Sequence, residues 1–207
     1  MSNSKGQIVV VSGKMGSGKT TLTKLLLNMP LKIRNEIRFA STIYKIHDEI
    51  RRIMDEFGID TPEAVKVKDG ALLQFLGTDW GRKTYGEDVW VHATRNQVEQ
   101  LFEKVGAHAE NILVVISDCR FKNEFEAFPE ALRIRLECPK VIRQQRCEQW
   151  RENDTHQSEV DLDDYVHAGR FDLIFDTQFS GPEHIAGVIR TTLERGDWIA
   201  KRLTEGK

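Results

Sequence analysis

Short runs of apolar residues alternate along this chain with longer segments in which apolar residues recur every three or four positions. Two of the runs, residues 7–11 and 112–117, are continuous and rich in β-branched residues, which predicts buried strands. In residues 132–136 the apolar positions alternate with charged ones, and this period of two predicts a half-exposed strand. Residues 37–40 and 171–175 complete the set of predicted strands.

The segments between these runs have the spacing of amphipathic helices. Helices are predicted over residues 19–27, 41–58, 69–76, 88–106 and 141–150, and from Pro182 to about Leu203. Residues 152–164 hold six acidic residues and no lysine or arginine, which predicts a loop. Apolar strands separated by helices are typical of the α/β class, and we expect a three-layer fold whose parallel sheet has about five strands, with helices on both faces.

Residues 41–106 are almost entirely helical by the same criterion. This stretch is too long for a single crossover between two parallel strands, for which about a dozen residues suffice. Part of it is therefore predicted to form a helical insert over the sheet.

Composition limits the function classes. The chain has 207 residues, of which 40% are hydrophobic and 30% charged, enough for one compact domain. Thirty basic and 32 acidic residues give a net charge of −2, which argues against nucleic acid or an anionic membrane as a partner. The three cysteines form no CxxC pair and no apolar run has the length of a signal peptide, so we expect a cytoplasmic protein.

The strongest chemical signal is the sequence GKMGSGKT at residues 13–20, which fits the P-loop pattern G-x-x-x-x-G-K-[ST]. A predicted buried strand precedes it and an amphipathic helix follows, as a phosphate-binding loop requires. Lys19 would place its charge at the β- and γ-phosphates of ATP, and Thr20 would offer a hydroxyl to Mg²⁺. A glycine-rich turn that only begins a helix is the alternative. The residues expected to contact the nucleotide are Gly13, Lys14, Gly16, Ser17, Gly18, Lys19 and Thr20.

The strand predicted at residues 112–117 is followed by Asp118, Cys119 and Arg120. The chain has no NKxD-type guanine motif, and the Asp-Glu pair with which ATP-hydrolysing motors orient water is absent at this strand end. An arginine there favours transfer to an anionic acceptor instead. Asp118 would order Mg²⁺ or contact the acceptor, and Arg120 would bind a phosphate. The alternative is an ordinary strand-end cap with a surface arginine.

Residues 140–151 carry a net charge of +3 from four basic residues and one acidic residue. Phosphoryl transfer needs cations that close over the transferred group, and a lid with several arginines supplies them. We predict catalytic roles for Arg143 and Arg146 and substrate contact for Arg151, without deciding which arginine reaches the phosphates. A solvated basic helix face is the alternative.

An acceptor pocket is predicted from residues 74–82. Gln74, Thr78 and Arg82 are four residues apart and share one helix face, which offers an amide, a hydroxyl and a guanidinium beside Trp80. The alternative is a helix break whose tryptophans lie in the core.

The order of these motifs resembles the small deoxynucleoside monophosphate kinases of bacteriophages, members of the P-loop nucleoside monophosphate kinase group. The resemblance rests on the P-loop, LLQFLGTDWGR with the following VWV, DCR, NDTHQSE and FDLIFD, which together span most of the chain. The chain departs from the family after Ala40, where Pro-Leu-Lys is missing, and at residues 176–178, which read Asp-Thr-Gln.

The resemblance implies that ATP donates its γ-phosphate to a deoxynucleoside monophosphate in the presence of Mg²⁺, giving ADP and the diphosphate. It implies a single domain with a core of residues 1–40, 107–139 and 165–207, an acceptor-binding insert over about 41–106 and a lid over about 140–164. Asp118 and Arg120 match the family's Asp-x-Arg. The residues that it places in the acceptor region are Arg38, Phe39, Asp79, Trp80, Arg82 and Trp90, beside Gln74 and Thr78.

Two other functions stay open. Animal-type phosphomevalonate kinases share the P-loop, a similar Asp-x-Arg and a related acidic motif, so the acceptor is either a nucleotide or another small phosphorylated molecule. A non-catalytic ATP-binding regulator would bind ATP without turnover, and it would have little use for cations around the transferred group. The exposed face of the helix at residues 88–106 offers a surface for a homodimer, although a solvated face is the commoner case.

Overall fold

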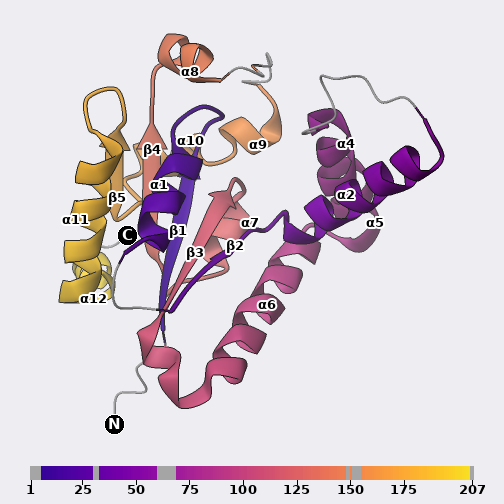
Figure 1. Ribbon diagram of the computed structural model, residues 1–207. Coiled ribbons are helices and arrows are strands. Elements are labelled where there is room, and N and C mark those ends of the chain that lie inside the picture. The colour runs from indigo at the N-terminus through magenta and orange to yellow at the C-terminus, as the bar shows by residue number, and fades with distance from the viewer. Residues whose placement is uncertain (1–5, 30–32, 60–68, 148–149, 151–154, 206–207) are drawn as a thin grey trace.

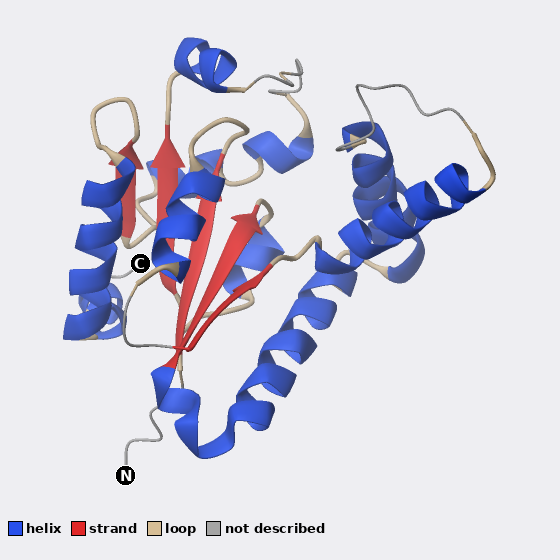
Figure 2. Cartoon of the chain, in the orientation of Figure 1, coloured by secondary structure: helices blue, strands red, loops and turns tan. Residues whose placement is uncertain are grey.

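A parallel sheet forms the centre of the protein. The computed structural model describes residues 6–29, 33–59, 69–147, 150 and 155–205. Its strands are β1 (Gln7–Gly13), β2 (Ile33–Ile37), β3 (Ile112–Cys119), β4 (Leu132–Glu137) and β5 (Leu173–Asp176). They make one five-stranded sheet in the order β2-β3-β1-β4-β5, and every adjacent pair is parallel (Figure 2). The expected α/β fold with a five-stranded parallel sheet is confirmed.

Two predictions about strands are wrong. The second strand ends at Ile37, and the residues predicted to extend it form a turn whose backbone N–H groups bind side chains instead of a neighbouring strand. β4 is buried, not half-exposed, because neighbouring elements cover both of its faces. Its two arginines are each 3% exposed: Arg133 packs over the Phe125 ring, and Arg135 donates to Ser12 Oγ.

The longer helices follow the apolar spacing. They are α1 (Lys19–Leu27), α2 (Ser41–Glu56), α6 (Val89–Val105) and α11 (Pro182–Arg195). The shorter ones are α4 (Gly70–Gln74), η1 (Phe75–Arg82), α5 (Lys83–Tyr85), η2 (Gly106–Asn111), α7 (Lys122–Glu126), α8 (Lys140–Arg146), α9 (Gln157–Val160), α10 (Asp163–His167) and α12 (Trp198–Glu205).

Three helix predictions need correction. The segment predicted as an acidic loop contains α9 and α10, because its acids bind backbone and basic groups of neighbouring elements instead of water alone. The predicted C-terminal helix is two helices, since Gly196 adopts a left-handed conformation that ends α11. The helix predicted at 69–76 continues without a break into η1, which is a π-helix.

Helices cover both faces of the sheet (Figure 1). Alternate residues of β1 point to opposite sides, as in any strand. Val9 and Val11 belong to a cluster with Leu22 of α1 and Ile189 of α11. Val10 belongs to the other cluster, which includes residues of α2, η1, α6 and α7. Every apolar position of the central strand is therefore covered, which explains why its sequence shows no alternation.

Helices α2, α4 and α5 lie beside the carboxyl ends of the strands, and α6 returns from them toward the start of β3 (Figure 1). This group coincides with the predicted insert, although the division into core, insert and lid stays a prediction. In the described part of the chain, no helix is both long and apolar enough to cross a bilayer.

Candidate active site

Glycines shape the loop between β1 and α1. Gly13 and Gly16 have φ angles of 151° and 78°. A Cβ on Gly13 would lie 2.5 Å from Ser17 Oγ and 2.7 Å from the Leu136 carbonyl oxygen. A Cβ on Gly16 would lie 2.7 Å from the Arg143 carbonyl oxygen. Side chains at these positions would therefore force the loop away from β4 and α8.

Lys19 is the first residue of α1 and lies against this loop. Its Nζ donates to the carbonyl oxygens of Gly13 and Lys14 at 2.5 and 3.0 Å. Burial and the neighbouring Arg120 lower the pKa of Lys19 to about 7. A phosphate bound in the P-loop would lie close to this ammonium group and would favour its charged form. Thr20, the next residue, is exposed.

A cavity of about 580 Å³ connects the P-loop with α2, α4 and η1. It brings together eleven of the residues predicted from the sequence: Gly16, Lys19, Thr20, Arg38, Phe39, Gln74, Thr78, Arg82, Trp90, Asp118 and Arg120. Residues far apart in the chain thus face one space. The cavity lies at the carboxyl ends of the strands, where open α/β sheets bind their ligands.

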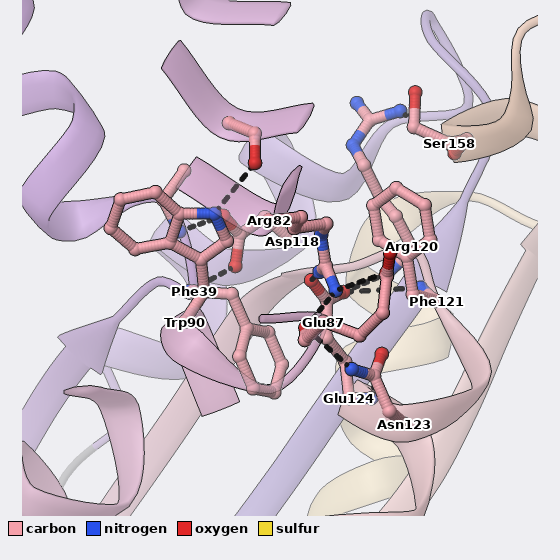
Figure 3. Close-up of polar contacts among 12 residues, drawn as sticks. Phe39, Arg82, Glu87, Trp90, Asp118, Arg120, Phe121, Asn123, Glu124 and Ser158 are labelled. Carbon is pink, nitrogen blue, oxygen red and sulfur yellow. Dashed lines mark hydrogen bonds and ion pairs between the residues drawn. The ribbon is translucent and has the colours of Figure 1, made fainter. Parts of the chain in front are cut away.

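Asp118 connects β3 to the start of α2 (Figure 3). Its Oδ1 accepts from the backbone N–H of Phe39 at 2.8 Å, and its Oδ2 accepts from that of Ala40 at 3.0 Å. Burial raises the pKa of Asp118, although these two hydrogen bonds oppose the rise. Since both oxygens accept from backbone groups, Asp118 positions the first turn of α2 beside the cavity.

The donors around the cavity fit a magnesium ion that is bound mainly through phosphate. Among the described residues, no group of three or more His, Cys, Asp or Glu side chains could hold a metal on its own. Mg²⁺ commonly keeps several waters and takes one or two protein ligands beside substrate phosphates. Thr20 lines the cavity with an exposed hydroxyl and would be such a ligand.

Arg82 is held by a buried carboxylate (Figure 3). Its Nη2 lies 2.6 Å from Glu124 Oε1, and its guanidinium stacks 4.1 Å from the centre of the Phe121 ring. Glu124 Oε2 also accepts from the backbone N–H groups of Arg120 and Phe121, at 2.7 and 3.1 Å. Burial raises the pKa of Glu124 to about 7 against the opposing effect of Arg82. The carboxylate therefore ties the guanidinium of Arg82 to the backbone of Arg120.

Trp90 fixes the shape of the π-helix η1. Its Nε1 donates to the Gly77 carbonyl oxygen at 2.7 Å (Figure 3). Gly81 lies against the indole, and a Cβ there would be 2.2 Å from Trp90 Cζ2. Trp90 is buried, so it positions the wall that carries Gln74 and Thr78.

Some predicted site residues lie elsewhere. Trp80 packs edge-on against the Tyr85 ring at 5.2 Å, and Asp79 pairs with Lys83 at 2.6 Å, both away from the cavity lining. Predicted nucleotide contacts outside the lining are Gly13, Lys14, Ser17 and Gly18, which belong to the loop behind it.

The predicted lid arginines do not line the cavity either. The Nη1 of Arg143 donates to the Met15 carbonyl oxygen at 3.1 Å, which supports the P-loop from behind. Arg146 Nη2 donates to the Thr177 carbonyl oxygen at 2.9 Å. Arg151 falls outside the described residues.

The chain is similar to a protein family and to several solved structures. A family model described as an AAA domain matches residues 9–167. The chain belongs to this AAA domain family. Its structure is similar to that of TT1252 from Thermus thermophilus, with 15% identity and a TM-score of 0.57, over 92% of this chain and 98% of that one. Shikimate kinase from Aquifex aeolicus matches with 15% identity and a TM-score of 0.46, over 91% of this chain and 96% of that one. A search of curated proteins gave no match.

Two buried acids of this AAA domain were not predicted as site residues. Glu124 holds Arg82, and Glu159 accepts from the Met15 N–H at 2.9 Å and pairs with Arg120. The segment of residues 152–164, which contains Glu159, was predicted as a loop and not as part of the site. The pairing with Arg120 depends on tertiary packing of α9 onto the P-loop, for which the sequence offers only the clustering of acids.

Proposed function

We propose that this AAA domain transfers the γ-phosphate of ATP to a deoxynucleoside monophosphate. One observation carries the proposal: a single cavity is lined by P-loop residues and by the polar wall of α4 and η1. A donor with its phosphates at Lys19 and an acceptor at Gln74 and Thr78 would share this space. Direct transfer between two bound ligands requires such an arrangement.

The charges around the cavity support phosphoryl transfer. Lys19 and Arg120 both line it, and each would neutralise charge on the transferring phosphoryl group. Mg²⁺ bound through Thr20 would add to this charge stabilisation. Arg143 contributes indirectly in the proposal, since it holds the P-loop through the Met15 carbonyl.

The acceptor side of the cavity favours a nucleotide. Gln74 offers an amide that can read a base edge, and Tyr44 and Phe39 add aromatic surface to the same lining. Arg38 supplies a cation for the phosphate of the acceptor. An acceptor without a base, such as phosphomevalonate, would leave the amide and the aromatic surface unused.

The test is ADP formation from Mg·ATP by the purified chain. The acceptors are the four common deoxynucleoside monophosphates, their ribose counterparts and phosphomevalonate. Turnover with at least one deoxynucleoside monophosphate is expected. Turnover with phosphomevalonate alone would move the function to another phosphorylated acceptor, and ATP binding without turnover on any acceptor would contradict a kinase.

A matched pair of variants tests the acceptor assignment. Gln74→Ala is expected to change the ranking of the bases by about tenfold or more, since a bidentate base contact is worth about 1–3 kcal/mol. Gln97→Ala removes the same group from α6, outside the cavity lining, and should leave the ranking unchanged. Equal rankings in the two variants would show that Gln74 does not read the base.

A further inference from the structure

One carboxylate from outside the P-loop reaches into it. Glu159 lies in α9 and is 5% exposed. Its Oε2 accepts a hydrogen bond from the Met15 backbone N–H at 2.9 Å, and its Oε1 pairs with Arg120 Nη1. Met15 is the third residue of the motif, so this N–H belongs to the loop that would surround a polyphosphate.

The groups around Glu159 are those that would bind a phosphate. A loop N–H and a guanidinium suit phosphate oxygens as well as they suit a carboxylate. Lys19 adds a positive charge nearby. Burial disfavours the charged form of Glu159, but Arg120, the Met15 N–H and Lys19 outweigh burial and lower its pKa. The carboxylate is therefore ionised at neutral pH, as a phosphate would be.

A second acid secures the same segment to the loop. Asp163, in α10, accepts from Lys14 Nζ at 2.8 Å and from Arg135 Nη2 at 3.1 Å. Lys14 is the second residue of the P-loop motif, and Arg135 lies in the adjacent strand β4. Two acids four residues apart thus hold α9 and α10 against the loop, so the contact of Glu159 with Met15 is part of a larger docking.

The Glu159 carboxylate and a bound phosphate cannot both occupy the position at the Met15 N–H. An N–H group makes one strong, nearly linear hydrogen bond, so Met15 cannot donate fully to a carboxylate and to a phosphate oxygen at once. We propose that Glu159 is an internal competitor for the phosphate-binding loop, which the polyphosphate of a nucleotide must displace from Met15 and Arg120. This inference rests only on the nucleotide-binding half of the proposed function and is independent of the acceptor.

Competition of this kind lowers the apparent affinity for any polyphosphate. The apparent dissociation constant is the intrinsic one divided by the fraction of molecules whose site is free, so a site free about one tenth of the time binds about tenfold more weakly. Removing the charge of Glu159 should restore that factor, whereas most substitutions of residues that support a site weaken binding.

The test is isothermal titration calorimetry of the full chain with Mg·ADP and, separately, with pyrophosphate. Glu159→Gln keeps the shape of the side chain and removes its charge. We expect it to bind both probes about tenfold more tightly than the parent. Asp164→Asn is the matched control, because it removes one charge from an exposed residue of α10 that pairs with Lys122. It should bind like the parent.

The opposite result has a clear meaning. Equal or weaker binding of both probes by Glu159→Gln would overturn the proposal and indicate that Glu159 stays in place to orient Arg120. Circular dichroism and thermal unfolding establish that the variant is folded. If it is not, Glu159→Asp, which withdraws the carboxylate by one methylene, is expected to tighten binding to a smaller extent. Tighter binding by the variant, together with no turnover by the parent on any acceptor, would contradict only the proposed kinase function.

Discussion

The Lys19 ammonium group shares its surroundings with two arginines, Arg120 and Arg135, and with two carboxylates, Asp118 and Glu159. The two positive and two negative neighbours oppose each other, so burial is the main influence on the pKa of Lys19, which falls to about 7. A polyphosphate would change this balance by adding several negative charges at once. The residue therefore gains its full charge only together with the ligand that needs it.

Lys19→Ala is expected to reduce ADP formation by at least about a hundredfold, because it removes the cation nearest to the P-loop carbonyl oxygens and to the transferred group. The fold should persist, since Lys19 is a member of neither apolar cluster and its hydrogen bonds to the Gly13 and Lys14 carbonyl oxygens lie within the P-loop itself. Turnover and far-UV circular dichroism are the measurements. Parent-like activity in a folded variant would overturn the assignment of the P-loop.

Nucleotide binding should also take up protons at alkaline pH. Because the pKa of Lys19 is lowered to about 7, the free protein holds a mostly neutral amine at pH 8, and a bound polyphosphate raises that pKa again. We expect uptake of up to about one proton per Mg·ADP at pH 8, with affinity falling as the pH rises from 7 to 10. Calorimetry in buffers of different ionisation enthalpy measures this uptake.

The matched controls for this uptake lie on one helix. Lys19→Met has no titratable group and should bind without taking up protons, although more weakly. Lys24→Met makes the same change at an exposed position of α1 and should behave like the parent. Proton uptake by Lys19→Met equal to that of the parent would assign the titration to another group.

Asp118 has a structural role that a substitution can expose. Asp118→Asn replaces one acceptor oxygen by an amide NH₂, which would face the backbone N–H of Phe39 or Ala40. We expect the free energy of unfolding to fall by about 1–3 kcal/mol, the cost of a buried donor left without an acceptor. Urea unfolding measures it. Stability equal to that of the parent would show that this turn tolerates one lost hydrogen bond.

At the scale of elements, the π-helix η1 packs closely against Trp90 through Gly77 and Gly81. Gly81→Ala would place a methyl group 2.2 Å from Trp90 Cζ2 and 2.7 Å from the Leu76 carbonyl oxygen, which belongs to the backbone of η1 itself. We expect a loss of about 1–3 kcal/mol in the free energy of unfolding. Gly187→Ala is the control, because a Cβ in α11 meets nothing within 4 Å and helix propensity favours alanine. It should leave stability unchanged or raise it by up to about 1 kcal/mol.

Elements with a strong apolar period could be predicted from the sequence. β1, β3, α1 and α6 lie where their patterns indicate, since each buries a continuous apolar face. The burial of β4 could not be predicted in this way, because Arg135 binds partners that are remote in the chain and Arg133 packs over the Phe125 ring. The same reason explains α9, whose position depends on a contact between Glu159 and Met15.

The candidate site was predictable to a similar degree. The P-loop and the carboxyl ends of the strands indicated where the cavity lies, because local motifs and topology determine both. Which polar side chains face inward depends on helix geometry. Gln74, the last residue of α4, and Thr78 in η1 line the cavity, whereas Trp80 and Asp79 of η1 contact Tyr85 and Lys83 instead. The four-residue spacing of Gln74, Thr78 and Arg82 predicted a shared helix face, and all three line the cavity, whereas Asp79 and Trp80 lie off that face.

At the scale of the whole molecule, one cavity joins the P-loop to the helices α2, α4 and η1. An adenosine joined through a polyphosphate chain to a deoxynucleoside should therefore bind more tightly than ATP or the monophosphate alone, by roughly 10²-fold or more, because the second contact becomes intramolecular. Competition with ATP in the turnover assay measures the gain. Inhibition no stronger than that by ADP would show that the two ligands do not occupy the cavity together.

The strand order has a consequence for synthesis of the chain. β1 is the central strand and is made first, yet the register pairs Gln7 with Leu113 and Val9 with Leu132. At about 5–20 residues per second, translation takes roughly 5–20 s to supply the first of these neighbours. During that interval a strand with four consecutive apolar residues has both hydrogen-bonding edges open. A nascent chain released early would expose this segment, so premature termination before β3 should yield aggregates or chaperone-bound fragments.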